Sequence, residues 1–93
     1  MEHRWGNRIP LQREEVAVCK AGRALGRARG VDINRSGIGL ECELGLHAGE
    51  MVEVQLAGWK HPVRCLVVHA DKNRCGLMFL SVPEKGPWNR EEQ

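Results

Sequence analysis

Met-Val-Glu-Val-Gln-Leu, residues 51–56, is the stretch that decides the fold class. Its second, fourth and sixth residues are apolar, whereas Glu53 and Gln55 between them are polar. Alternation with a period of two is typical of a β-strand that has one face in the core, because successive side chains of a strand point to opposite sides. The stretch therefore predicts a half-buried strand rather than an amphipathic helix.

Five further runs of strand type lie on either side of this stretch. Residues 63–70 are apolar and rich in β-branched side chains, and residues 74–80 follow a polar turn at residues 71–73. The three runs before residue 51 are Glu15–Lys20, Arg23–Ile33 and Gly37–Cys42. Because no window repeats apolar residues at helical spacing, we expect an all-β fold, a small six-stranded antiparallel barrel without exposed sheet edges.

The 93 residues are expected to form one domain with a small core. Residues 1–13 show neither a helical nor a strand period, which predicts a flexible N-terminal arm. Residues 14–82 would form the barrel. Residues 83–93 are polar and contain two prolines, which predicts a C-terminal tail that frays or forms a short helical turn.

The composition points to a soluble protein of the cytoplasm. Hydrophobic residues make up 42% and charged residues 28%, and no apolar run approaches the roughly 20 residues of a membrane helix. The first eight residues lack the apolar core of a signal peptide. Four cysteines are present without a Cys-x-x-Cys pair or a zinc-like Cys/His cluster. We therefore expect reduced thiols, no metal, no cofactor and no contact with a membrane.

The net charge of +2 is unevenly distributed. Residues 1–35 carry eight Lys and Arg against four Asp and Glu, whereas residues 36–93 carry six against eight. A basic N-terminal third fits an anionic partner, although a solvated basic surface would explain the charges equally well.

Two short motifs carry the chemistry of the sequence. Arg4-Trp5-Gly6-Asn7-Arg8 places two arginines four residues apart in the arm, and Val31–Gly37 ends a strand in an Asp/Asn/Gly turn. A guanidinium donates paired hydrogen bonds to phosphate oxygens or to the O6/N7 edge of guanine, and it can stack on a base. Together the motifs fit a site for an anionic ligand that contains guanine, although a turn in which Asp and Asn side chains cap backbone groups would explain the second motif equally well.

The second motif would supply the other side of that site. Asp32 offers acceptors for the N1–H and N2–H groups of guanine, and Asn34 offers both a donor and an acceptor. Residues 32 and 34 of an extended segment would point to the same side. Gly37 would permit a turn with positive φ and a close approach of the backbone. One guanine could then be held from both edges.

At these residues the sequence resembles the PilZ family. That family is marked by an R-x-x-x-R motif before a six-stranded antiparallel barrel and by a [D/N]-x-S-x-x-G motif further along the chain. Arg4 and Arg8 match the first motif. Asp32, Asn34 and Gly37 match the second, with asparagine in place of the serine. The resemblance extends from the arm to about residue 80.

A second register also satisfies the family pattern, with Asn34, Ser36 and Gly39 at its three marked positions. We prefer the register that starts at Asp32, because it leaves the apolar residues after Gly37 in the next strand.

The resemblance implies a receptor for cyclic di-GMP, which the family often binds as a stacked dimer of the nucleotide. Arg4 and Arg8 would contact phosphate and guanine, while Asp32 and Asn34 would read a guanine edge. Some members place an aromatic ring late in the penultimate strand, where it stacks on the ligand. His69 is the candidate for that position here, and strand alternation would place it on the same face as the apolar residues at 63, 65 and 67.

The implied mechanism is that of an adaptor. Ligand binding would order the N-terminal arm, and the changed surface would then regulate a separate effector protein or the packing of a homodimer.

Three other functions have to be compared with this one. A ligand-blind PilZ-like adaptor would keep the fold and work by protein contact alone. A small nucleic-acid-binding barrel would need a stacking platform, but only 4% of the residues are aromatic, so we expect no nucleic-acid polymer as partner. An enzyme is not expected, because the chain has no Gly-rich phosphate loop and no G-x-S-x-G motif. Cys65 and His69 would lie about 13 Å apart along a strand, too far for a nucleophile and its base.

Overall fold

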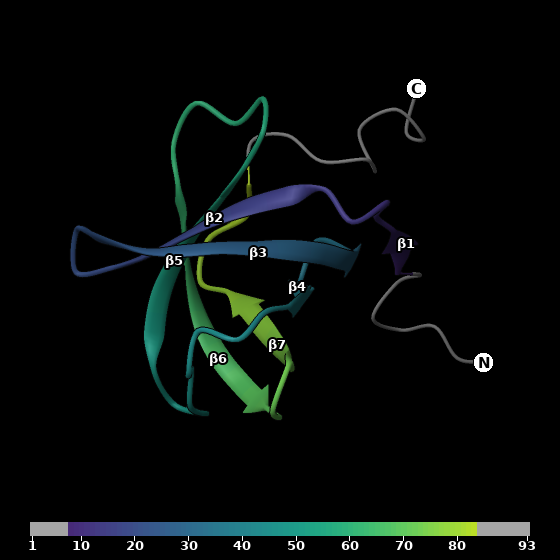
Figure 1. Ribbon diagram of the computed structural model, residues 1–93. Helices are drawn as coiled ribbons and strands as arrows, with labels where there is room; N and C mark the ends of the chain where they lie inside the picture. Colours follow the sequence, from purple (N-terminus) through teal and green to yellow (C-terminus); the bar gives the residue numbers. More distant parts are fainter. Residues whose placement is uncertain (1–7, 84–93) are drawn as a thin grey trace, which may run out of the picture.

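The computed structural model describes residues 8–83 of the chain (Figure 1). These residues form seven β-strands and no helix, so none of the described residues belongs to a helix that could cross a membrane. The strands are β1 (Ile9–Pro10), β2 (Glu15–Lys20), β3 (Arg23–Ile33), β4 (Gly37–Glu41), β5 (Met51–Leu56), β6 (Val63–Ala70) and β7 (Arg74–Phe79).

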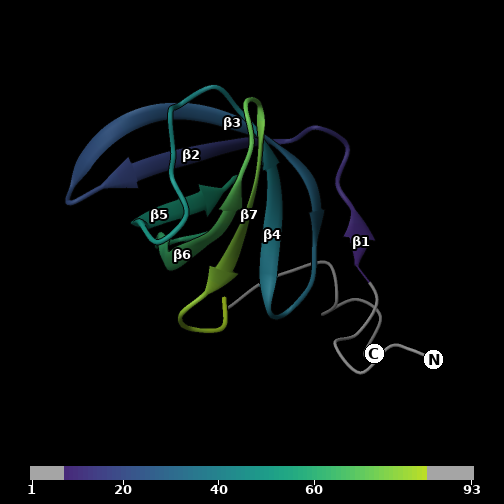
Figure 2. The same ribbon diagram turned by 90° about the horizontal axis from the view of Figure 1, so that it is seen from below.

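The strands pair antiparallel in the order β1-β3-β2-β5-β6-β7-β4, and β4 also pairs with β3. This last pairing closes six of the strands into a ring, which Figure 2 shows from below. The long β2–β3 hairpin projects beyond the other strands in both views. The predicted all-β, barrel-like architecture of six antiparallel strands is confirmed.

The predicted strands agree with the observed ones to within one residue at each end. In β5 the alternation has the expected result, since Val52, Val54 and Leu56 are buried and the residues between them are not. The same pattern in the other strands fills the ring with a core of apolar side chains, which includes Val16, Ile33, Ile38, Leu40 and Val67. All four cysteines are free thiols, as expected.

The strand β1 was not predicted. Ile9 and Pro10 pair with Ile33 and Asp32 at the end of β3, outside the closed ring. Two residues are too short a run to give a period, so only the pairing itself reveals this strand. Its consequence is that Arg8, which precedes it directly, lies next to β3.

Two β-bulges change which residues face outward. In β3 the pairing with β4 shifts between Gly30 and Asp32, and in β6 the pairing with β7 shifts between Val67 and His69. Each bulge adds one unpaired residue and reverses the alternation beyond it. His69 therefore faces outward and is exposed, and the prediction that it shares a face with Val67 is wrong.

Gly37 is required for a close approach of two strands. A Cβ atom at this position would overlap the backbone carbonyl oxygen of Leu77 in β7. The predicted close approach is thus confirmed. The predicted positive φ is wrong, because Gly37 is already the first residue of β4 and is not among the residues with positive φ.

Candidate ligand-binding site

A cavity of about 350 Å³ lies on the outer face of the ring where β3, β4, β7 and β6 run side by side. We call this cavity the cradle. The lining residues that matter for its chemistry are Arg8, Asp32, Gly39, His69, Arg74 and Gly76. Three of these, Arg8, Asp32 and His69, were predicted as site residues from distant parts of the sequence. The volume lies within the range of roughly 300–1,000 Å³ that is usual for small-molecule sites.

Two glycines form the floor of the cradle. The strand register places Asp32 opposite Gly39, Gly39 opposite Gly76, and Gly76 opposite His69, so that these four residues form one row across four strands. A Cβ atom at Gly39 would lie 2.8 Å from Oδ1 of Asp32, and one at Gly76 would overlap the imidazole of His69. The carboxylate and the imidazole therefore lean over the glycines from opposite sides.

The two bulges give the cradle matching walls. In β3 the bulge leaves both Val31 and Asp32 partly exposed, and in β6 it leaves both Val68 and His69 exposed. Each wall thus presents one apolar and one polar side chain to the cavity. A ligand with a flat ring and polar edges fits between these two walls.

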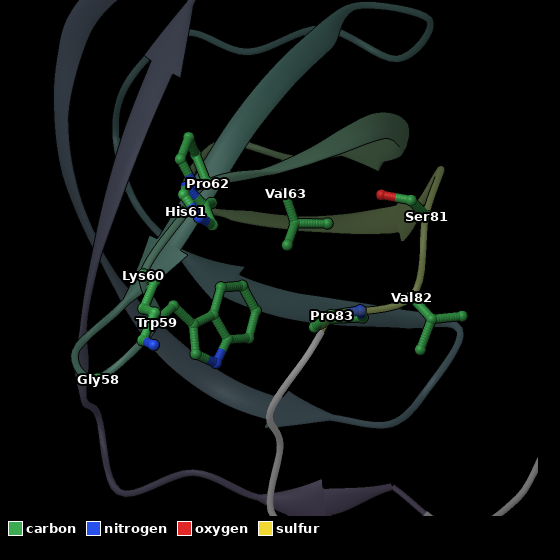
Figure 3. Close-up of a pocket in the computed structure, with 9 residues that line it drawn as sticks. All are labelled: Gly58, Trp59, Lys60, His61, Pro62, Val63, Ser81, Val82 and Pro83. Carbon is green, nitrogen blue, oxygen red and sulfur yellow. The ribbon is translucent and has the colours of Figure 1, made fainter.

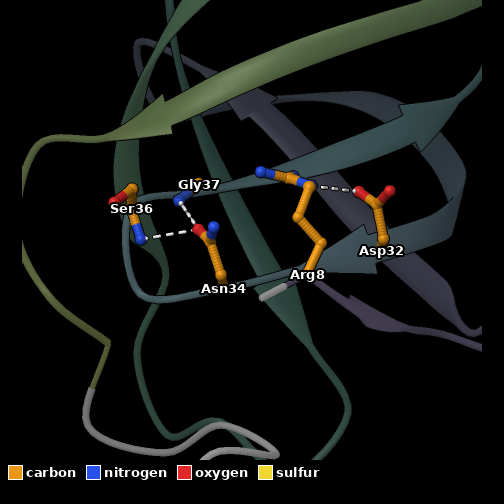
Figure 4. Close-up of polar contacts among 5 residues, drawn as sticks. All are labelled: Arg8, Asp32, Asn34, Ser36 and Gly37. Carbon is orange, nitrogen blue, oxygen red and sulfur yellow. Dashed lines mark hydrogen bonds and ion pairs between the residues drawn. The ribbon is translucent and has the colours of Figure 1, made fainter. Parts of the chain in front are cut away.

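Arg8 and Asp32 form an ion pair at one wall, with 2.9 Å between Nε and Oδ1 (Figure 4). The side chains are 44% and 33% exposed. Exposed ion pairs contribute only about 0–1 kcal/mol, because water competes for both groups. A ligand that offers a phosphate to the guanidinium and a donor to the carboxylate could therefore separate the two side chains at small cost.

Asn34 has a different role from the one expected. Its side chain is only 6% exposed, and its Oδ1 accepts hydrogen bonds from the backbone N–H groups of Ser36 (2.8 Å) and Gly37 (3.0 Å) (Figure 4). The chain turns directly after Ile33, so residues 32 and 34 are not on one side of an extended segment. Neither Asn34 nor Gly37 lines the cradle. Arg4, the remaining predicted site residue, lies outside the described residues.

Arg74 was missed by the sequence analysis. It begins β7 and lines the cradle, and its register partner is Glu41 of β4, which in turn pairs with Arg29 of β3. The carboxylate of Glu41 accepts a hydrogen bond from Arg13 at 2.6 Å. Arg74 therefore brings a positive charge to this edge of the cradle, and the neighbouring carboxylate of Glu41 is already paired with Arg13. Arg74 and Gly76 stand two residues apart, which places them on the same face of a strand. This spacing is the signal that could have identified both residues from the sequence.

The thiol of Cys75 lies beneath the floor, where it is buried. Burial raises the pKa of Cys75 to about 12, and Cys42, whose sulfur lies 3.8 Å away, adds to this effect. Within residues 8–83 no group of three or more His, Cys, Asp or Glu side chains could hold a metal ion. The side chains that the cradle presents to a ligand include arginine, carboxylate and imidazole groups.

A second cavity, of about 430 Å³, lies between residues 58–63 and the end of the described chain (Figure 3). Figure 3 shows the indole of Trp59 pointing toward Val63 and Pro83. Trp59 also makes an edge-to-face contact with Phe79, with 6.3 Å between the ring centroids. None of the predicted site residues lines this cavity, so it is not the site that the motifs indicate.

Replacing Asn34 by Ala should destabilise the fold, because two backbone N–H groups of the turn lose their acceptor. We expect a loss of about 1–3 kcal/mol in the free energy of unfolding, measured by urea denaturation. Asn34→Asp keeps an acceptor oxygen and is the matched control, with a much smaller loss. An unchanged midpoint for Asn34→Ala would contradict the role of Asn34 in the turn.

Comparison with known proteins adds no family to this description. No family model matches the chain, and no curated protein matches it significantly.

Proposed function

We propose that this protein is a cytoplasmic receptor that binds cyclic di-GMP in the cradle and passes the signal to a separate partner. The observation that carries the proposal is the convergence of Arg8, Asp32 and His69 in one cavity. The sequence motifs indicate Arg8 and Asp32 for a guanine nucleotide, and the resemblance to the PilZ family indicates His69.

The charges around the cradle favour an anionic ligand. Arg8 and Arg74 line the cavity, and the carboxylates nearby, Asp32 and Glu41, are already matched by arginines. Guanidinium groups match phosphate oxygens through paired, charge-assisted hydrogen bonds. The phosphates of the ligand would therefore lie toward Arg8 and Arg74.

The floor of the cradle favours a flat base. A purine placed above Gly39 and Gly76 would have one edge at Asp32 and the other at His69, once the carboxylate and the imidazole have moved aside from the glycines over which they lean. The carboxylate of Asp32 would accept from N1–H and N2–H of guanine, which adenine does not present. This assignment replaces the one made from the motif alone, because Asn34 is occupied in the turn and His69 takes the opposite edge.

The change in surface that a partner protein detects would come from β1. Only two residue pairs join β1 to β3, and Arg8 precedes β1 directly. If Arg8 leaves Asp32 for a phosphate, the start of β1 loses a side-chain contact that holds it against β3. A surface that shifts on binding is what a partner protein could read.

A ligand-blind adaptor is the second candidate. It is favoured by one observation, namely that Arg8 pairs with Asp32 within the chain. In that case the ion pair would only fasten β1 to the ring.

Calorimetric titration of the full chain with cyclic di-GMP tests the proposal. We expect saturable binding to cyclic di-GMP and none to GTP or to a short single-stranded oligonucleotide. No heat from a folded sample would contradict the receptor and leave the ligand-blind adaptor.

Replacing Arg8 by Ala should abolish this binding and leave the fold nearly unchanged, since an exposed ion pair is worth only about 0–1 kcal/mol. Binding is measured by calorimetry and the fold by thermal unfolding. Arg27→Ala is the control, because Arg27 pairs with Glu15 in an ion pair that is more exposed and does not line the cradle. Equal losses for both variants would mean that only the overall charge matters.

Replacing Gly76 by Ala should weaken cyclic di-GMP binding about tenfold, or about 1.4 kcal/mol. The added methyl group would displace the imidazole of His69 and raise the floor. Because His69 is exposed and can swing outward, the thermal unfolding midpoint should hardly change. Unchanged affinity for Gly76→Ala would show that the base does not rest on this floor.

A further inference from the structure

An apolar row crosses the outer face of β5, β6 and β7, next to the cradle. The strand register places Met51 opposite Leu66 and Leu66 opposite Met78. Met51 is 50% exposed, Met78 is 41% exposed, and Leu66 lies between them partly exposed. We call these three residues the apolar row.

The apolar row is part of a larger patch. Val68 stands two positions along β6 from Leu66, and Leu80 stands two positions along the chain from Met78. Of the six large hydrophobic residues that are exposed among residues 8–83, four belong to this patch. Singly scattered apolar residues are normal on a surface, whereas a contiguous patch marks a surface that another molecule covers.

Two unpaired charges of opposite sign flank the row. Glu53 of β5 and Arg64 of β6 are register partners on the outer face, two residues along their strands from Met51 and Leu66. Within residues 8–83 neither of them forms an ion pair, although both face outward. The face thus carries an apolar centre together with an acid and a base that are both available.

These features make the face complementary to itself. A two-fold axis that runs along the strands between β5 and β6 would place Met51 on Leu66 of a second copy. The same axis would place Glu53 on Arg64 of the second copy, and Arg64 on Glu53. In such an interface every contact occurs twice. The first residue of a pair in one copy meets the second residue in the other copy, and the second meets the first.

We propose that the outer face of β5 and β6 is the centre of a homodimer interface, formed by Met51 and Leu66 and closed by two Glu53–Arg64 ion pairs. A second copy of this chain is the occupant that pairs both charges and covers Met51 and Leu66 at once. The interface adjoins the cradle through Val68, which belongs to the patch and also lines the cavity.

Sedimentation velocity of the full chain tests the interface without any nucleotide. We expect a dimer for the wild type and a dimer that is at least about tenfold weaker for Leu66→Glu. Leu25→Glu is the matched control, because Leu25 is exposed on β3 away from the patch and its replacement should leave the dimer intact.

Charge reversal gives the sharper test. Glu53→Arg and Arg64→Glu should each weaken the homodimer, because each variant alone brings like charges together across the axis. An equimolar mixture of the two variants should form a heterodimer as strong as the wild type, since both ion pairs are then restored between the chains. Repulsion within one chain cannot be relieved by mixing, so this outcome identifies the contact as one between copies.

Three results would overturn the proposal. They are a wild type that stays monomeric at every concentration reached, a dimer that Leu25→Glu weakens as much as Leu66→Glu does, and single variants whose mixture does not associate. A monomer that still binds cyclic di-GMP would overturn the interface alone and leave the receptor function standing.

Discussion

In a closed ring of strands, each side chain must face either the core or the outside, and one added residue reverses that choice. Two bulges of this protein, one in β3 and one in β6, act through that constraint. Before each bulge the alternation fills the core, and at the bulge it brings a valine and a polar residue to the surface together. Without the bulge in β6, the imidazole of His69 would point toward the core. The cradle exists because both bulges occur on strands that flank the same pair of glycines.

The sequence predicted the strands well and the site only in part, and the reasons are physical. Alternation depends on nearest neighbours along the chain, so it is visible in residues 51–56 and in the other runs. Which strand lies beside which depends on closure of the ring, and no local pattern shows that Gly39 lies opposite Gly76. A bulge is a property of two strands, which is why the face of His69 was wrong. Arg74 belongs to no sequence motif, so only its position in the structure identifies it as a residue that lines the cradle.

Asn34 illustrates how a motif can combine folding and binding. The pattern that pointed to it marks a turn as well as a ligand, and its side-chain oxygen is used by the turn. Asp32, two residues earlier, stands on the bulge and is turned outward to the cradle. Short polar side chains compete for backbone groups wherever the chain reverses, so their hydrogen-bonding capacity in a turn is not a guide to what they offer a ligand.

The glycines of the barrel are constrained in two different ways, and this has a consequence for how the sequence can change over time. At Gly37 a side chain would meet backbone, which cannot move aside. At Gly76 it would meet only the imidazole of His69, a side chain that can itself be exchanged. A descendant that no longer needed its ligand could therefore lose His69 and Gly76 together while Gly37 stayed fixed. Among related sequences, conservation of residues 69 and 76 together would indicate that the cradle is still used. Conservation of glycine at position 37 would indicate only that the fold is kept.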